Sequence, residues 1–272
     1  AGLDNVVAVA PIDENADRTL TAFQVIPAEG PNAESTDALV RELRALDVPG
    51  TTLGVAGQAT VNIDISENLN DILPLYLLVV VGLSLLIMIV VFRSLVVPLI
   101  ATGGFILSVF ATFGAVVAMF QWGWGADLLG FAAGPILSFL PVMLIGILFG
   151  LAMDYQLFLA TGMREAYVHG APARVAVARG FRAGRSVVIA AGLIMVSVFG
   201  GFVFGESVII RQMGFGLAIG VLLDALVVRM LLMPALMHVL GKSAWWLPAW
   251  LDRLLPNVDV EGAALERRDA HV

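Results

Sequence analysis

The stretch GILFGLAMDYQLFLATGMREAYVHG, residues 146–170, places one carboxylate inside a long apolar run. Asp154 has no basic residue closer than Arg164, ten positions further along the chain. At about 1.5 Å per helical residue, Asp154 lies about 15 Å from that arginine. A charge at the middle of a bilayer costs about 2.5–3.5 kcal/mol on insertion scales, so this acid is expected to face the interior of a helix bundle.

The composition of the whole chain also indicates a membrane protein. Of its 272 residues, 59% are hydrophobic and 14% are charged, whereas roughly 25% of the residues of a soluble domain are charged. The chain has no cysteine and three histidines, which excludes a disulfide framework and a thiolate metal site, and we expect no metal and no cofactor. Its net charge of −7 argues against a nucleic-acid partner.

Five apolar blocks are long enough to cross a bilayer, which requires about 20 helical residues. They fall within a bundle that we assign to residues 72–240. We place the spans at about 72–92, 95–119, 136–160, 186–206 and 209–229. The expected fold class is therefore a membrane α-helical bundle, preceded by a partial α/β domain outside the membrane.

Residues 1–71 form that preceding domain. β-Branched residues bounded by proline predict strands at 6–11 and 19–27, and TTLGVAGQ predicts a third strand at 51–58. The stretch STDALVRELRAL, residues 35–46, predicts an amphipathic helix before the third strand. A strand–helix–strand segment of this length is too small for a complete α/β domain.

The basic residues predict the orientation in the membrane. The expected loop at 161–185 carries five arginines, which indicates the cytoplasmic side, whereas the connection at 120–135 has no arginine or lysine and is expected outside. The segment 241–272 is then cytoplasmic. Within it we predict an interfacial amphipathic helix at 244–255 and a disordered acidic tail after Pro256.

Asp154 and Tyr155 are the main candidates for function. Ionisable residues inside membrane spans commonly mark ion or proton pathways. A carboxyl group at this depth can take up and release protons, and the adjacent phenol needs a hydrogen-bond partner and can orient a carboxylate. The alternative interpretation is a neutral Asp154 that hydrogen-bonds a neighbouring helix for structural reasons.

Asp224 and Arg229 form a second polar pair, in LLDALVVRMLLMPALM. A separation of five residues places them about 140° apart on an α-helix, so we do not expect them to face each other well. Arg229 is expected near the cytoplasmic end of its span, where its long side chain can extend to water. We interpret the two residues as a structural ion pair or cap.

A GxxxG pattern precedes each of the two acids. Such a spacing of small residues lets helices pack closely, although the pattern alone is a weak signal. The four glycines are Gly146, Gly150, Gly216 and Gly220. We therefore expect close helix packing beside both acids.

The stretch GLAMDYQLFLATGMREAYVHG resembles the span-and-loop signature of the MMPL (mycobacterial membrane protein large) family, in the resistance–nodulation–division superfamily of transporters. Residues 214–237 resemble the last span of that family, and residues 25–44 and 55–69 resemble its second extracytoplasmic domain. Full-length members have two similar halves, each with one span, an extracytoplasmic α/β domain and five more spans. The resemblance implies that this chain is the end of the second domain with spans eight to twelve.

The resemblance also implies a mechanism. In the family an Asp-Tyr pair on span four faces an Asp-Tyr pair on span ten, and together they carry protons; Asp154 and Tyr155 match the pair on span ten. Ser186 and Ser197, on the following span, are candidates for the same relay. The implied partners are the missing N-terminal half, membrane lipids and a hydrophobic cargo, namely lipids, hydrophobic metabolites or drugs.

We therefore interpret the chain as the C-terminal half of an exporter driven by the proton motive force in the bacterial plasma membrane, and not as an enzyme. One alternative is a non-transporting, sterol-sensing-like scaffold of the same fold. Another is an intramembrane aspartyl protease that uses Asp154 and Asp224, since residues 234–236 spell its PAL motif. Against the protease, the order is Asp-Tyr rather than Tyr-Asp, and no GxGD motif surrounds Asp224.

Overall fold

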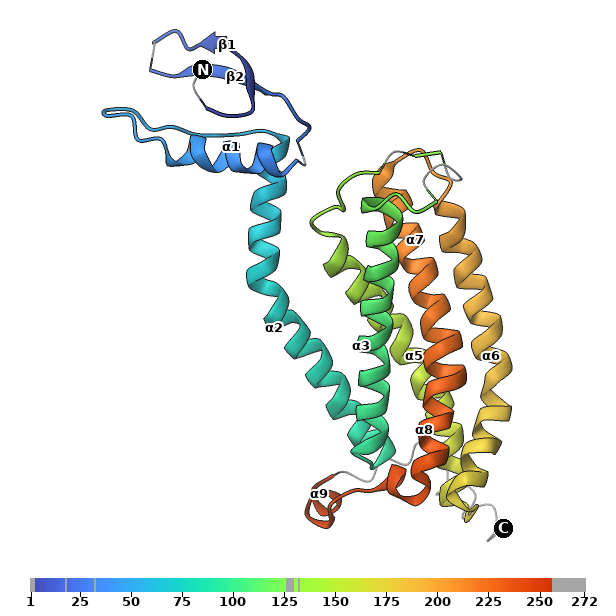
Figure 1. The fold of residues 1–272 in the computed structure, drawn as a ribbon. Coiled ribbons are helices and arrows are strands. Elements are labelled where there is room, and N and C mark those ends of the chain that lie inside the picture. Colours follow the sequence, from blue (N-terminus) through green and yellow to red (C-terminus); the bar gives the residue numbers. More distant parts are fainter. Residues whose placement is uncertain (1–2, 18, 32, 126–129, 132, 256–272) are drawn as a thin grey trace. The chain divides into compact units, whose positions relative to one another are not determined.

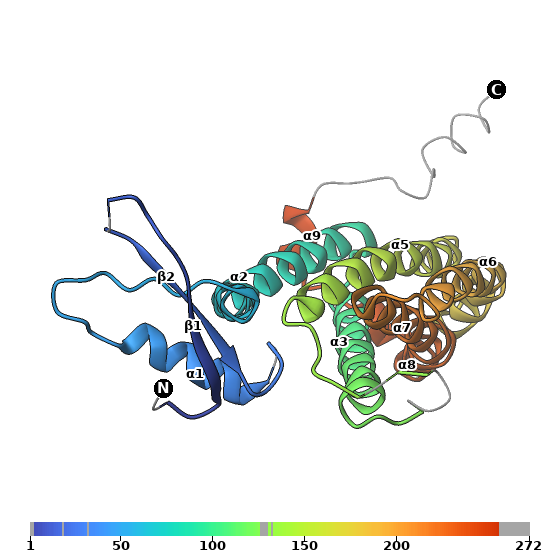
Figure 2. The ribbon, with the colours of Figure 1, turned by 90° about the horizontal axis from the view of Figure 1, so that it is seen from above.

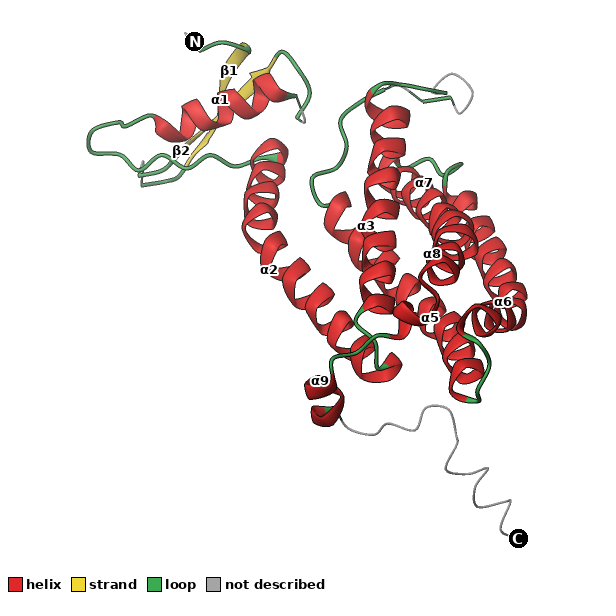
Figure 3. Cartoon of the chain, turned by 60° about the horizontal axis from the view of Figure 1, so that its bottom comes forward, coloured by secondary structure: helices red, strands yellow, loops and turns green. Residues whose placement is uncertain are grey.

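The computed structural model describes residues 3–17, 19–31, 33–125, 130–131 and 133–255. The chain separates into two compact units, Ala1–Ile72 and Leu73–Val272. In the described chain the only sheet is a two-stranded one in the first unit, and long helices make up the second (Figures 1 and 3). The predicted fold class, a helical membrane bundle after a small sheet-containing segment, is confirmed.

The first unit contains a β-hairpin and a helix. Strand β1 (Val6–Glu14) pairs antiparallel with β2 (Thr21–Pro27), with Val9 opposite Val25. Helix α1 (Glu34–Ala45) buries Leu39 and Val40 on one face, as its amphipathic pattern predicts. The two predicted strands and the predicted helix therefore exist close to their expected positions.

The third predicted strand, at 51–58, is wrong. Residues 46–57 form no strand in the described chain, and helix α2 (Gln58–Phe92) begins where the strand was expected to end. Gly50 and Gly57 adopt φ angles of +78° and +149°. Such angles interrupt an extended backbone. The β-branched residues between the two glycines therefore did not form a strand.

A bidentate ion pair joins α1 to the start of α2. The Arg44 guanidinium donates through Nη1 and Nη2 to the Asp64 carboxylate at 2.7 and 3.0 Å. This hydrogen bond holds the pKa of Asp64 below its usual range. Both groups are solvated, so the pair fixes the position of α1 against the start of α2 but adds little to the free energy of unfolding.

Five helices of the described chain are long and apolar enough to cross a membrane, as the sequence predicts. They are Asp71–Phe92, Val96–Gln121, Leu140–Val168, Ala173–Phe202 and Val208–Trp245. The first lies within α2, the second joins α3 (Val96–Val116) to the π-helical turn η1 (Val117–Gln121), the third is α5 and the fourth is α6. The fifth is made of α7 (Val208–Leu223), the π-helical η2 (Asp224–Leu232), α8 (Met233–Leu240) and the 3-10 turn η3 (Gly241–Trp245).

The predicted loop at 161–185 is helical except for a short turn at 169–172. Helix α5 continues to Val168, and α6 begins at Ala173, directly after Pro172. Alanine and arginine are strong helix formers, so both helices extend past the apolar segments from which the spans were predicted. The arginines of this region therefore lie on helices that flank a tight turn.

Close contacts at glycine hold the bundle together. Helix α6 packs against α5 on one side and α7 on the other (Figure 2). A Cβ atom at Gly180 of α6 would collide with the backbone of Met163 in α5, and one at Gly184 would lie 2.6 Å from the Leu159 side chain. The two helices approach closely because these positions carry no side chain.

The predicted GxxxG glycines behave differently from one another. Gly216 and Gly220 of α7 lie against Leu144 and Leu148 of α5, with 2.8 and 2.6 Å between a built Cβ and the leucine methyl groups. Gly146 faces the Tyr76 hydroxyl of α2 in the same way, at 2.7 Å. Nothing in the described chain lies within 4 Å of a Cβ at Gly150. This last glycine therefore leaves open space on the surface of α5.

The segment after Leu240 folds back on the end of the bundle that holds the 93–95 and 169–172 turns, which we call the basic end. The Ser94 hydroxyl donates to the Ala244 carbonyl at 2.6 Å, and the Arg93 guanidinium pairs with Asp252 at 2.7 Å. The Tyr167 ring stacks on Trp245 with 5.2 Å between centroids. These contacts attach the segment to both turns.

The predicted amphipathic helix at 244–255 is shorter than expected. Residues up to Trp245 belong to η3, the chain is extended at 246–248, and only α9 (Ala249–Leu254) is helical after it. Pro248 precedes α9 and separates it from η3. The predicted tail at 256–272 lies outside the described residues.

Trp245→Ala is expected to destabilise the bundle. Trp245 is 7% exposed and stacks on Tyr167, and loss of a buried tryptophan costs about 3–5 kcal/mol. Thermal unfolding in detergent, followed by size-exclusion fluorescence, should show a clearly lower midpoint. Trp250→Ala is the matched control, because Trp250 is 69% exposed, and equal midpoints for the two variants would contradict this account of the basic end.

Candidate functional site

Asp154 lies in the middle of α5 but on its surface. The residue is exposed in the described chain, and no hydrogen bond or ion pair reaches its carboxylate from a described residue. The helices of this chain therefore leave Asp154 uncovered, and its expected place in the interior of a larger bundle stays a prediction. The uncovered groups on this side of α5 include Gly150, Asp154 and Phe158, at a spacing of four residues that puts them on one helical face.

An open groove of about 490 Å³ runs beside Asp154 between α5 and α6. Its walls combine polar, small and apolar side chains. The lining residues are Asp154, Leu157, Phe158, Thr161, Gly162 and Glu165 of α5 with Gly180, Ala183 and Gly184 of α6. The groove is large enough for water, because one water molecule needs only about 10–15 Å³ of cavity volume.

Tyr155 is partly buried and contacts a cation. The Arg229 guanidinium carbon lies 5.6 Å from the centroid of the Tyr155 ring. An arginine at this distance from an aromatic ring is attracted to it. Tyr155, the sequence neighbour of Asp154, therefore contacts the buried charges of η2.

Asp224 and Arg229 form a buried ion pair. Arg229 is 1% exposed and Asp224 is 9% exposed, and Arg229 Nε donates to an Asp224 carboxylate oxygen at 2.6 Å. Arg229 Nη2 also donates to the backbone carbonyl of Ala152 in α5, two residues before Asp154. Arg229 Nη1 is buried with no partner among the described residues. Arg229 thus binds η2 to the α5 segment that carries the candidate site.

The expected poor alignment of Asp224 and Arg229, and the expected extension of Arg229 to water, are both wrong. Residues Asp224–Leu232 are π-helical. A π-helix repeats its hydrogen bonds between residues five apart, so it brings such residues close to alignment, and π-helical turns are frequent at functional sites. The span also continues for sixteen residues beyond Arg229, to Trp245, so water at its end is out of reach.

The two serines on α6 do not contact Asp154. The Ser197 hydroxyl donates to the Leu193 carbonyl of its own helix at 2.7 Å, and the side chain is exposed. Ser186 is exposed too, and lies one turn beyond Ala183, which lines the groove. A part for either serine in a relay remains a prediction.

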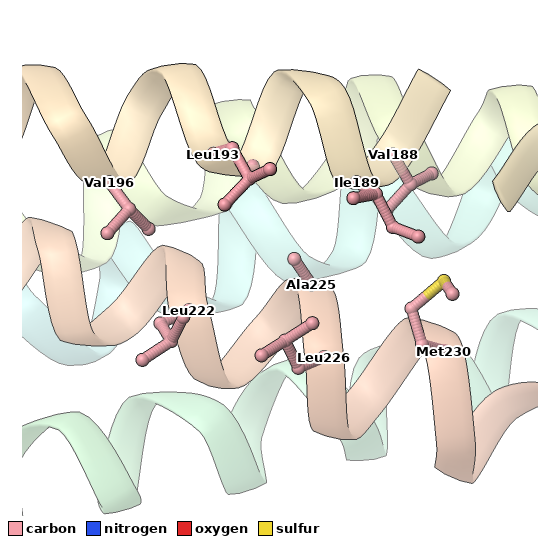
Figure 4. A pocket seen from close by; sticks show the side chains of 9 residues that line it. Val188, Ile189, Leu193, Val196, Leu222, Ala225, Leu226 and Met230 are labelled. Atoms are coloured by element: carbon pink, nitrogen blue, oxygen red, sulfur yellow. The ribbon is translucent and has the colours of Figure 1, made fainter. Parts of the chain in front are cut away.

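A second, smaller pocket lies on the other side of α6. Figure 4 shows its apolar side chains between α6 and the α7–η2 helix, among them Val188, Leu193, Leu226 and Met230. Its nine lining residues have no charged or hydrogen-bonding side chain. Of the two, only the groove at Asp154 has ionisable side chains in its lining. Within the described part of the chain, no group of three acids, histidines or cysteines is placed to bind a metal.

Asp224→Asn is expected to destabilise the bundle, because it leaves the buried Arg229 charge without its partner. Breaking a buried pair in this way costs about 3–5 kcal/mol. Thermal unfolding in detergent should therefore shift downward, and the double variant Asp224→Asn with Arg229→Gln should recover most of the loss. Leu231→Ala, at a side chain that is 66% exposed, serves as the control. A double variant as unstable as the sum of both single variants would contradict the coupling.

Comparisons with known proteins agree with the membrane architecture. The profile of the MMPL family matches residues 11–257. Membrane protein YdfJ of Bacillus subtilis (strain 168) is 46% identical over 271 residues, which are 98% of this chain and 37% of that protein. The heme uptake protein MmpL11 of Mycobacterium tuberculosis (strain ATCC 25618 / H37Rv) is 34% identical over 260 residues, 94% of this chain and 27% of that protein.

A third relative has an export function in its name. The trehalose monomycolate exporter MmpL3 of Mycolicibacterium smegmatis is 34% identical over 216 residues, 79% of this chain and 21% of that protein. The chain thus spans between about a fifth and two fifths of the length of these relatives. Because the family profile covers most of the chain and its relatives match almost throughout, this multi-pass membrane protein belongs to the MMPL family.

Proposed function

We propose that the chain is the C-terminal half of a proton-driven exporter of lipids or other hydrophobic molecules, in which Asp154 carries the proton. The observation that supports this most directly is the uncovered Asp154 carboxylate in the middle of an apolar span. Leaving such a group against lipid is costly, so another polar surface is expected to cover it. The relatives are much longer than this chain, and the remaining length is available to supply that surface.

The covering surface is expected to contribute a second acid. The exposed face of α5 at Gly150, Asp154 and Phe158 provides a site for this acid, because Gly150 leaves open space one turn before Asp154. Two carboxyl groups in close contact titrate as a coupled pair, so one of them can hold a proton while the other is ionised. Asp154 and its partner would then load a proton from one side of the membrane and release it to the other.

Tyr155 and the buried ion pair position this site. Arg229 holds the Ala152 carbonyl and the Tyr155 ring, which lie on either side of Asp154 in sequence. Its charge is balanced by Asp224, so the pair adds little net charge beside the relay. A change in the protonation of Asp154 would shift α5 relative to its neighbours, and α2 would transmit the motion to the first unit, which handles the cargo.

The cargo class comes from the relatives alone. One relative is a trehalose monomycolate exporter by name, another is a mycolic acid-containing lipids exporter, and a third takes up heme. These are large amphipathic or hydrophobic molecules. We accordingly propose that the cargo is a lipid, a hydrophobic metabolite or a drug. We also propose that the protein lies in the bacterial plasma membrane.

The scaffold and protease interpretations predict different behaviour. A scaffold of this fold needs no titrating acid, so it should tolerate loss of the Asp154 carboxylate. The protease requires two aspartates that share a water molecule, but Asp224 is already held by Arg229, while Asp154 is uncovered. Both interpretations are tested by the variants below.

Cysteine labelling tests the orientation, because the basic end is expected in the cytoplasm. Cysteines at Gln121 and His169, which are both exposed and lie at opposite ends of the bundle, should react with a membrane-impermeant maleimide from opposite sides. In intact cells, Gln121→Cys should label and His169→Cys should label only after permeabilisation. Labelling of both in intact cells would contradict the orientation.

Asp154→Asn should abolish proton-coupled transport while the protein still inserts and elutes as the wild type does. The amide keeps the size of the side chain and its hydrogen-bonding capacity but cannot exchange a proton. The measurement is efflux of a hydrophobic dye by the complete gene product in proteoliposomes with a pH gradient. Asp154→Glu, which retains a carboxyl group, should keep part of the activity, and undiminished efflux by Asp154→Asn would end the relay proposal.

A further inference from the structure

A stripe of polar side chains, interrupted by Phe158, runs along α5 from Asp154 toward the basic end. Thr161 and Glu165 follow Asp154 at intervals of seven and four residues, which places all three on one helical face. All three line the same groove. The eleven residues from Asp154 to Glu165 correspond to about 16 Å along the helix, so the stripe connects the middle of the span to the last turn of α5.

The facing wall of the groove is built from small residues. Gly180, Ala183 and Gly184 of α6 line it. The contacts of Gly180 with Met163 and of Gly184 with Leu159 bring α6 close to α5, while the short Ala183 side chain leaves the space between the helices open. A groove with room for water therefore lies beside two helices that are otherwise in tight contact.

Glu165 is the acid of this stripe that lies nearest the basic end. It is exposed, it lies three residues before the end of α5, and its carboxylate has no hydrogen bond or ion pair to any described residue. The ring of His169 contacts the backbone carbonyl of Glu165 at 2.7 Å and not its carboxylate. Thr161, between the two acids, donates its hydroxyl proton to the Leu157 carbonyl at 2.7 Å, so its oxygen remains able to accept from water.

The charged groups around Glu165 are arranged on both helices. Arg164 is directed elsewhere, since it donates to the Phe92 carbonyl at 2.7 Å and lies over the Trp245 ring. On α6, Arg179 lies one turn before Ala183 on the same side, whereas Arg182 is two residues from Gly180 and Gly184 and therefore lies on the far side. At the other end of the stripe, the charged neighbours of Asp154 are the paired Asp224 and Arg229 behind Tyr155.

We infer that this stripe is the proton passage between Asp154 and the water at the basic end, with Glu165 as the carboxylate at its mouth; the inference rests on the proposed function. The protonated Asp154 gives its proton to water in the groove, this water passes a proton to the Glu165 carboxylate, and Glu165 releases it to bulk water. No bond other than O–H forms or breaks, and the charge lost at one carboxyl group is regained at the other. Glu165 acts on the proton path and does not bind the cargo.

The test measures proton flux through the complete gene product in proteoliposomes, with a pH-sensitive dye inside. Glu165→Gln should lower the flux about tenfold, and Glu165→Asp, which keeps a carboxyl group, should retain most of it. Raising the concentration of a membrane-impermeant buffer should restore part of the flux of Glu165→Gln, because buffer molecules then accept the proton at the mouth. A merely structural role of Glu165 would not respond to buffer.

Two further variants keep the test decisive. Ala183→Leu fills the groove from α6 without altering an ionisable group, and it should also lower the flux, with no recovery by buffer. Glu206→Gln is the control, since Glu206 is an exposed acid that follows the other end of α6, and its flux should equal that of the wild type. If Glu165→Gln does not elute from a size-exclusion column as the wild type does, the proton flux of Ala183→Leu becomes the test of the inference.

The outcomes separate this inference from the proposed function. If Asp154→Asn stops the flux while Glu165→Gln and Ala183→Leu both leave it unchanged, the proton follows another path and this inference is wrong. If Asp154→Asn itself leaves the flux unchanged, the proposed function is wrong and the passage with it. Loss of flux in all three variants, with recovery by buffer for Glu165→Gln alone, supports both.

Discussion

The hydrocarbon core of a bilayer contains no water to solvate a charge, and this constraint decides where each ionisable residue of the bundle lies. Asp224 and Arg229 meet it by pairing with each other and with the Ala152 carbonyl. Asp154 does not meet it within this chain, because no described residue reaches its carboxylate. The bundle thus contains one buried charge pair that is compensated and one carboxylate, Asp154, that is not.

Small residues explain how the bundle is both tightly packed and locally open. Gly180, Gly184, Gly216 and Gly220 remove the side chains that would separate α6 and α7 from α5. Gly150 and Ala183 are also small, but in the described chain no neighbouring side chain fills the space beside them. This space lies next to Asp154. Close packing and the groove are therefore two results of one compositional feature of the helices.

Hydropathy predicted the five spans, and β-branched composition predicted both observed strands, because each depends on local sequence. The ends of the helices were less predictable. Hydropathy stops at the edge of the apolar core, whereas α5 and α6 continue to a turn at 169–172, since alanine and arginine also favour helix. The strand that composition favours at 51–58 is likewise missing from the described chain, and glycines with positive φ bound that segment at Gly50 and Gly57.

The residues of the candidate site can be chosen from the sequence, but their geometry cannot. Asp154 and Tyr155 follow from one acid in an apolar run, yet only the fold places the acid on the surface. The predicted poor alignment of Asp224 and Arg229 is wrong because it assumed an α-helix, whereas residues 224–232 are π-helical. The sequence shows the spacing of Thr161 and Glu165 from Asp154, but only the structure shows that the three residues line one groove.

The position of Arg229 on the same helix as Asp224 has a consequence for synthesis of the protein. Only four residues separate the two charges in the chain, so they leave the ribosome almost together and reach the translocon within one segment. Lateral release into lipid can then occur with both charges already neutralised as a dipole, before this last span has packed against the four spans made earlier. The Asp154 segment has no such internal counter-charge, so its release into lipid depends on what the membrane already contains.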